Sequence, residues 1–314
     1  MNALDIRSKF FGGMLGSALG DAIGELAFSY PSEKALWTII EKTDLLQYTD
    51  DTAMALGIAE SLVERGTIDP HHFGETFRKN FEREPWRGYG PGPPTVFALV
   101  RQGYSYQEAA QRLFGGEGSF GNGSAMRITP LGLFFYNSKN LYERAAQSAE
   151  VTHTHPLAKD GAAILAHAVA MGVSLNPEEE FPIVHYLSEL EKVPRTLKFK
   201  KRLLLVEQLI HEKADQRYAA RELGTNVTVH GSVPFAIYSF LKNPHSFVEC
   251  LFHAIMVRGD RDTIGAMACG ISGAFLGVEN IPSEWLLKLE NRSYIEELAL
   301  RLVEKIQEQY HNFK

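Results

Sequence analysis

The sequence has little cysteine and no long apolar run, and each shortage excludes a class of protein. Its two cysteines, Cys250 and Cys269, lie in no CxxC or other metal-type spacing. We therefore expect both to be small core residues and the protein to be cytoplasmic. No stretch of about 18 uninterrupted apolar residues occurs, so we expect no membrane-spanning segment. The apolar stretch after Lys9 continues into Asp21, which favours a packed helix over a signal peptide.

An excess of positive charge is also missing. The formal net charge is -6 and the isoelectric point is about 6.0, which argues against direct binding to a nucleic-acid backbone. The 45% hydrophobic and 22% charged residues are ordinary for a globular protein that buries a sizeable core. A length of 314 residues fits one large domain or two closely packed ones.

The third absence is any convincing alternation of apolar and polar residues, and no internal repeat of fixed period occurs either. Apolar residues recur instead at helical spacing throughout. We therefore predict an all-α fold, a single orthogonally packed multi-helix bundle spanning residues 1–314 as one domain. Helices are expected at 8–27, 49–65, 69–83, 141–151, 157–172, 247–256, 263–276 and 293–309. Residues 85–96 are expected to form a loop, followed by a helix to about residue 113.

What the sequence does contain begins with a stripe of glycines in the first helix. Gly12, Gly16, Gly20 and Gly24 recur every four residues and line one helix face. Each costs about 1 kcal/mol relative to alanine, so we expect another backbone or a ligand to approach this face closely. In the same apolar helix, Asp21 and Glu25 share a face and form a candidate acidic pair.

Two threonine–aspartate clusters open apolar helices more than two hundred residues apart. One contains Thr49, Asp50 and Asp51, and the other contains Asp260, Asp262 and Thr263. Threonine and aspartate are common helix N-caps, so each cluster alone is explained by capping. Two oxygen-rich clusters in one chain also predict a site for two hard divalent cations.

A glycine-rich loop at residues 114–124 precedes another apolar stretch. Its glycines allow backbone N–H groups to approach a ligand, so it is a candidate phosphate cradle, although no Gly-Lys-Ser/Thr follows as in a Walker loop. His153 and His155 lie two residues apart in THTHP. No further zinc ligands with suitable spacing accompany them, which favours a hydrogen-bonding role.

Taken together, these motifs resemble the ADP-ribosylglycohydrolase family. The matching stretches, in the family's order, are GSALGDAIG at 16–24, YTDDTAMA at 48–55, GYGPG at 88–92, GSFGNGSAMRITPLGL at 118–133, THTHP at 152–156 and RGDRDTIGAMACGISGAFLG at 258–277. The resemblance implies an all-α bundle with a dinuclear Mg²⁺ site in a cleft, with Mn²⁺ able to substitute. It implies the metal ligands Thr49, Asp50, Asp51, Asp260, Asp262 and Thr263.

The same resemblance implies the substrate-binding residues. The loop with Gly118, Ser119, Phe120, Gly121, Asn122 and Gly123 would hold the diphosphate and distal ribose of ADP-ribose. His153 would contact ribose, and Asp21 would line the site and support the metal ligands.

The implied reaction is attack of an activated water on the ribose C1, with Asp51 and Asp262 as catalytic metal-site residues. Family members often have a glutamate seven residues after the position of Asp21, where this chain has Phe28; Glu25 is the nearest carboxylate and the remaining catalytic candidate. A second departure is Arg258, where the family usually has glycine. Arg258, and Arg261 between the two aspartates, would each point to solvent or pair with a carboxylate or a substrate phosphate.

Three functions are considered for these motifs. The first is a Mg²⁺-dependent hydrolase that cleaves ADP-ribose from a protein side chain, such as arginine or serine, or from a small conjugate. The second is a non-catalytic, crystallin-like ADP-ribose binder, which the missing glutamate favours. The third is an isoprenoid synthase, which is disfavoured because its acidic motifs lie well inside facing helices rather than at helix starts.

Overall fold

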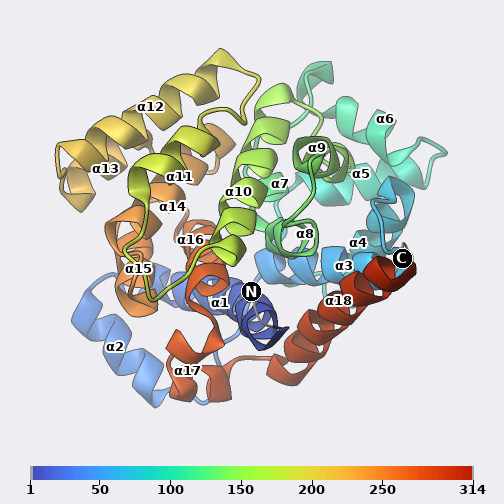
Figure 1. Cartoon of the computed structure of the whole chain (residues 1–314). Coiled ribbons are helices and arrows are strands. Elements are labelled where there is room, and N and C mark those ends of the chain that lie inside the picture. Colours follow the sequence, from blue (N-terminus) through green and yellow to red (C-terminus); the bar gives the residue numbers. More distant parts are fainter. Residues whose placement is uncertain (1–2, 313–314) are drawn as a thin grey trace.

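The computed structural model describes residues 3–312, and nearly all of their regular structure is helical. Two isolated β-bridges are the only strand-type pairings in this part of the chain, so the all-α prediction is confirmed (Figure 1). The longer helices are α1 (Ala3–Ser29), α2 (Glu33–Lys42), α3 (Asp50–Arg65), α4 (Pro70–Arg83), α5 (Gly92–Val100), α9 (Leu141–Glu150), α10 (Pro156–Ser174), α12 (Leu197–His211), α14 (Val229–Lys242), α15 (Phe247–Ile255), α16 (Arg261–Leu276) and α18 (Arg292–Asn312). The shorter ones are α6 (Tyr106–Gln111), η1 (Leu113–Gly116), α7 (Gly123–Met126), α8 (Thr129–Phe134), α11 (Ile183–Leu190), α13 (Gln216–Leu223), η2 (Val278–Asn280) and α17 (Ser283–Lys288).

The centre of the molecule is an unusually close pair of helices, α1 and α16. The expected glycine stripe of α1 lies directly against the α16 backbone. A Cβ on Gly20 would lie 2.2 Å from the carbonyl oxygen of Gly265, and one on Gly12 would lie 2.3 Å from that of Gly273. The prediction that another backbone comes close is therefore confirmed, and only glycine fits at these crossings.

The pairing is antiparallel, and this places the end of α1 beside the start of α16. At that end a Cβ on Gly24 would lie 2.6 Å from the carbonyl oxygen of Arg261 and from Cα of Asp262. Asp21, one turn earlier in α1, is thereby brought to the first turn of α16. The packing of the two helices thus creates the acidic site.

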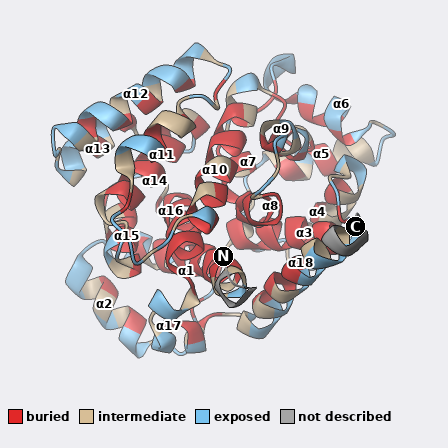
Figure 2. Cartoon of the chain, viewed as in Figure 1, coloured by how far each residue is buried: buried red, intermediate tan, exposed pale blue. Residues whose placement is uncertain are grey.

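Around this pair, α3, α8 and α10 are buried along much of their length, whereas α2, α12, α13 and α18 have exposed outer faces (Figure 2). Helix α3 begins as predicted, with Thr49 at the N-cap, and ends at Gly66, whose φ of 66° is left-handed. No helix in the described part of the chain combines the length and the apolar character that crossing a membrane requires.

The predicted loop at 85–96 was wrong in its second half, because α5 begins at Gly92. Pro93 is tolerated there because the first helical turn needs no intrahelical N–H donor. The predicted helix to residue 113 is divided, since α5 ends at Val100 and α6 begins after Ser105. Ser105 and Glu108 form a capping box, which gives α6 its own start.

Candidate active site

Three carboxylates from three different helices meet at the predicted metal site. Asp21 of α1, Asp51 of α3 and Asp262 of α16 offer oxygen atoms that all lie within 4.8 Å of one another. Asp21 and Asp51 are buried, and Asp262 is half-buried. The two threonine–aspartate clusters, far apart in the sequence, therefore form one oxygen-rich group that could hold a metal ion.

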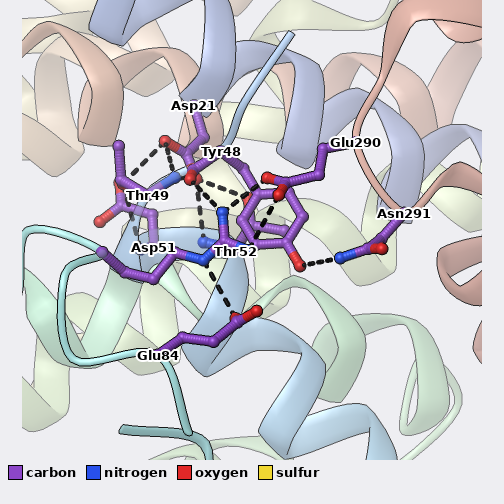
Figure 3. A network of polar contacts seen from close by, with 9 residues as sticks. Asp21, Tyr48, Thr49, Asp51, Thr52, Glu84, Glu290 and Asn291 are labelled. Carbon is purple, nitrogen blue, oxygen red and sulfur yellow. Dashed lines mark hydrogen bonds and ion pairs between the residues drawn. The ribbon is translucent and has the colours of Figure 1, made fainter. Parts of the chain in front are cut away.

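Asp21 holds the turn that begins α3. Its two carboxylate oxygens accept hydrogen bonds from the backbone N–H of Thr49 at 3.1 and 3.0 Å, and one accepts from that of Thr52 at 3.0 Å. The hydroxyls of Thr49 and Thr52 donate to the same carboxylate at 2.8 and 2.5 Å. Figure 3 shows both threonines converging on Asp21. A carboxylate on α1 therefore fixes the position of Asp51 on α3.

Helix capping does not account for the remaining oxygens. Among the described residues, Asp51 Oδ2 and Asp262 Oδ1 are buried without any hydrogen-bond partner. Asp260 is the N-cap residue of α16, but its side chain makes no capping hydrogen bond. Buried polar atoms are rarely left unpaired, and a bound divalent cation would satisfy both oxygens. The donor set of carboxylate and hydroxyl oxygens fits Mg²⁺ or Mn²⁺.

The electrostatics of the cluster agree with a cation site. Burial, followed by the charge of Asp260, raises the pKa of Asp262 to about 8. Burial and then the charge of Asp21 raise the pKa of Asp50 to about 7. Burial raises the pKa of Asp21 to about 6 against its threonine hydrogen bonds, and burial followed by Asp262 raises that of Asp51 well above its usual range. Positive ions would relieve this crowding of negative charge.

The glycine-rich loop is attached directly to this cluster. The amide of Asn122 donates to Asp260 Oδ2 at 2.5 Å and to the Ser232 hydroxyl at 3.2 Å. The Asn122 N–H donates to the carbonyl of Val227 at 3.0 Å, so the loop also pairs with the segment before α14. The predicted substrate loop and the predicted metal ligands therefore adjoin. Burial raises the pKa of Asp260, and the hydrogen bonds from Asn122 and Thr263 offset part of this rise.

His153 lies beneath the same loop. A Cβ on Gly123 would lie 2.9 Å from His153 Cε1, and one on Gly121 would lie 3.5 Å from Nε2. Burial, followed by the charge of Arg127, lowers the pKa of His153 to about 3, so the ring is neutral. Its Nδ1 lies 2.7 Å from the Thr152 hydroxyl.

The residues of the loop differ in accessibility. Gly118 is buried with a φ of 74°, and a Cβ there would lie 2.1 Å from the Thr154 hydroxyl, so glycine is required. Ser119 is buried, and its hydroxyl accepts a hydrogen bond from Gly121 N at 3.1 Å. Phe120 is partly exposed beside His155, with ring centroids 5.2 Å apart.

A cavity of about 250 Å³ opens onto the acidic cluster. Its lining includes Glu25, Thr49, Asp50, Trp86 and Asp262. Glu25 is exposed on this wall, so a carboxylate from α1 lines the same space as the predicted metal ligands Thr49, Asp50 and Asp262. Trp86 is 68% exposed, so its side chain is accessible to a ligand in the cavity. Phe28, the family's usual glutamate position, is also exposed but is not among the lining residues.

Arg261 adopts none of the three expected arrangements. It is buried, and its guanidinium donates to the carbonyl of Ala27 near the end of α1. It therefore satisfies an unpaired carbonyl at a helix C-terminus instead of contacting solvent, a carboxylate or a phosphate. Arg258 is exposed.

Sequence reasoning missed two residues of the site. Thr52 was recognised only as part of the TDDT motif, although it makes two of the hydrogen bonds to Asp21. Trp86 was predicted only as part of a loop, and the presence of aromatic residues among Gly and Pro in that stretch was the available signal.

Comparisons with known proteins identify relatives along the whole chain. The family described as ADP-ribosylglycohydrolase matches residues 2–312. The ADP-ribosylhydrolase ARH3 of Mus musculus is 31% identical, over 96% of this chain and 92% of its own length. The ADP-ribosyl-[dinitrogen reductase] glycohydrolase of Rhodospirillum rubrum is 25% identical, over 92% and 93%. A solved structure described as an ADP-ribosylglycohydrolase-related protein complex superposes with a TM-score of 0.74 at 24% identity, covering 96% of this chain and 99% of its own, which shows the same fold.

Proposed function

This chain belongs to the ADP-ribosylglycohydrolase family, whose members hydrolyse ADP-ribose linkages, and we propose that it does so with two Mg²⁺ ions, for which Mn²⁺ can substitute. The substrate would be ADP-ribose joined through C1 of a ribose to a protein side chain, such as arginine or serine, or to a small acceptor. The observation that carries the proposal is the meeting of Asp51 and Asp262, each with a buried, unpartnered oxygen. An ADP-ribose binder without turnover is the alternative, favoured by Phe28.

We assign the ions to the two clusters at the starts of α3 and α16. Thr49, Asp50 and Asp51 would hold them from one side, and Asp260, Asp262 and Thr263 from the other. When bound, the ions would lower the pKa of a water molecule and neutralise the crowded carboxylates. Asp21 would orient the metal ligands and not bind the ions itself, because its oxygens already accept hydrogen bonds from Thr49 and Thr52.

We assign binding of the ADP-ribose moiety to the loop at 118–123 and to His153. Backbone N–H groups in the glycine-rich loop would donate to the diphosphate, because glycine permits close approach. Ser119, Phe120 and Asn122 would contact the phosphates and the distal ribose. The neutral imidazole of His153, buried beneath Gly121 and Gly123, would hydrogen-bond a ribose hydroxyl without adding charge.

We assign the proton transfer to Glu25, which lines the same cavity as Trp86. As the water oxygen bonds to C1, Glu25 would accept a proton from it. The bond between C1 and the acceptor atom would break, and its electron pair would leave with the acceptor. The proton held by Glu25 would then pass to the acceptor, which returns the carboxylate to its starting state.

Turnover of peptides ADP-ribosylated on arginine or on serine, with Mg²⁺ and with EDTA, tests the proposal. We expect hydrolysis of at least one peptide with Mg²⁺ and none with EDTA. Asp262→Asn should abolish hydrolysis, whereas Asp44→Asn, at an exposed position that belongs to neither the acidic cluster nor the cavity lining, should not. Undiminished turnover in EDTA would refute the metal dependence. Binding of ADP-ribose without turnover of any peptide would support the non-catalytic alternative.

A further inference from the structure

We propose that Arg87 and Glu290 are positioning residues that set the affinity of the site for divalent ions. They would act by holding residues 48–52, the metal-binding turn, in place. The inference rests on the proposed function, because it concerns the ions that this turn would bind. Neither residue lies in the acidic cluster, and Glu290 belongs to none of the motifs.

The Arg87 guanidinium is buried and joins two distant parts of the chain. It forms a bidentate ion pair with Glu290, in which Nη1 lies 2.6 Å from Oε2 and Nη2 lies 3.0 Å from Oε1. The same Nη1 donates to the carbonyl oxygen of Tyr48 at 3.0 Å. The two side chains are only 3% and 17% exposed, so water competes little for this pair. Tyr48 immediately precedes the metal-binding residue Thr49.

The backbone of Arg87 holds the turn from its other end. Its carbonyl oxygen accepts a hydrogen bond from the N–H of Asp50 at 2.8 Å. One residue therefore contacts the backbone on both sides of Thr49. The guanidinium also lies 4.1 Å from the centre of the Tyr48 ring, which adds a cation–π contact.

The segment that carries Glu290 reinforces this arrangement. Leu46 N–H donates to the carbonyl of Lys288 at 2.8 Å, and Glu290 N–H donates to the carbonyl of Leu46 at 3.0 Å. Asn291 donates to the Tyr48 hydroxyl at 2.8 Å. Figure 3 shows Tyr48 between the Asp21 hydrogen bonds on one side and Glu290 and Asn291 on the other. The chain that enters the turn is thus attached to the connection between α17 and α18.

Arg87 lines the cavity together with Asp50, and its contacts support a positional role. Its ion-pair partners among the described residues are Glu84 and Glu290, and neither belongs to the acidic cluster. These two carboxylates therefore orient the guanidinium. Among the described residues, Arg87 forms no ion pair with Asp50 or Asp51. Without the Glu290 carboxylate, the guanidinium would turn toward Glu84 and release the Tyr48 carbonyl. The turn would then be held by its hydrogen bonds to Asp21 without the contact to the Tyr48 carbonyl, and the Thr49 and Asp51 oxygens would be less firmly positioned.

Titration of the full-length protein with Mn²⁺ by calorimetry tests this inference. In Glu290→Gln we expect the Kd for Mn²⁺ to rise about 10- to 100-fold, the usual effect of removing a residue that orients metal ligands. The control is Glu296→Gln, which removes an ion pair to Arg292 in the same part of the chain without touching the turn. Its Kd should equal that of the wild type. Raised Mg²⁺ should restore the kcat of Glu290→Gln.

The possible outcomes separate the inference from the function. If Glu290→Gln has a lower unfolding temperature but an unchanged Kd, the ion pair is only structural and the inference is wrong. If Glu290→Gln fails to fold, the Kd of Arg87→Lys for Mn²⁺ is measured instead. This variant keeps the positive charge but loses the bidentate contact with Glu290. If the wild type itself binds no Mn²⁺, the proposed metal-dependent function fails, and the inference fails with it.

Discussion

Thr49 illustrates how one side chain serves both capping and the candidate site. Its hydroxyl accepts a hydrogen bond from the N–H of Asp51 at 3.3 Å and donates to Asp21 at 2.8 Å. Capping was therefore a sound interpretation for this residue. It fails for Asp260, whose side chain contacts Asn122 instead of the backbone of α16. The distinction could not be predicted, because it depends on a partner 138 residues away.

At the residue scale, we first predict that His153 makes the protein less stable in acid. Its pKa is about 3 in the folded protein, below the usual 6.5 that it regains on unfolding. The unfolded state therefore binds more protons below pH 6.5, and stability falls as the pH drops from 6.5 toward 3. Between pH 7 and pH 5 the loss in unfolding free energy should be on the order of 2 kcal/mol. His153→Gln should lack this part of the loss in denaturant titrations; an identical pH dependence would contradict the prediction.

We next predict that Glu25→Gln loses turnover but keeps its ligands. Removing an acid or base typically slows a reaction about 10²- to 10⁴-fold, so kcat should fall by at least about 100-fold. The Kd values for Mn²⁺ and ADP-ribose should change little, because Glu25 is exposed on the cavity wall. Phe28→Leu, outside that wall, is the matched control and should keep its kcat. A Glu25→Gln enzyme with normal kcat would remove Glu25 from the mechanism.

At the scale of elements, the contact between α1 and α16 determines where the acidic residues lie. The glycine spacing predicted this close approach, and the apolar periodicity predicted most of α3, α10 and α16. The division into α5 and α6 was not predicted, because Pro and Gly at residues 90–94 indicate a loop. Helix α2 went unnoticed, although Ser32 caps it by accepting from Ala35 N–H at 3.3 Å.

For this element pair, we predict that Gly20→Ala is strongly destabilising. The added Cβ would lie 2.2 Å from the carbonyl oxygen of Gly265, so the two helices must separate. Overpacking of this kind typically costs about 1–3 kcal/mol, and occasionally more. The unfolding free energy of Gly20→Ala should fall within this range or by a larger amount. Gly90→Ala is the control, because a Cβ there meets nothing within 4 Å. Equal stability of the two variants would show that the helices adjust freely.

At the scale of the whole molecule, the site draws on the start, middle and end of the chain. The ordered motifs contain the main residues of the candidate site. These residues could be predicted because the resemblance of the motifs to one family spans nearly the whole sequence. The ion pair of Arg87 with Glu290 joins residues 203 positions apart. No local pattern marks Glu290, so this part could be found only from the structure.

We propose that residues 1–314 form one domain, and this predicts a single unfolding transition. Helix α1 contacts both α16 and α18, so the two ends of the chain share a core. Calorimetry should give one peak whose van't Hoff and calorimetric enthalpies agree. Two separable transitions would indicate two domains.

The same calorimetric scans should also show that Mg²⁺ stabilises the protein. Mg²⁺ at about 100 times its Kd should stabilise the fold by about 2.7 kcal/mol for each independent site that it fills and raise the melting temperature by several degrees. Asp262→Asn should melt higher than the wild type without metal, because one crowded carboxylate is gone, and should lose the response to Mg²⁺. A variant that still responds fully would place the ions elsewhere.

The most direct measurement is anomalous diffraction from crystals of the wild-type protein soaked in Mn²⁺. Anomalous peaks should appear between the Asp51 and Asp262 carboxylates, with their unpartnered oxygens as ligands. Mn²⁺ peaks that lie away from Asp51 and Asp262, in crystals of a protein that hydrolyses ADP-ribosylated peptides, would contradict the assignment.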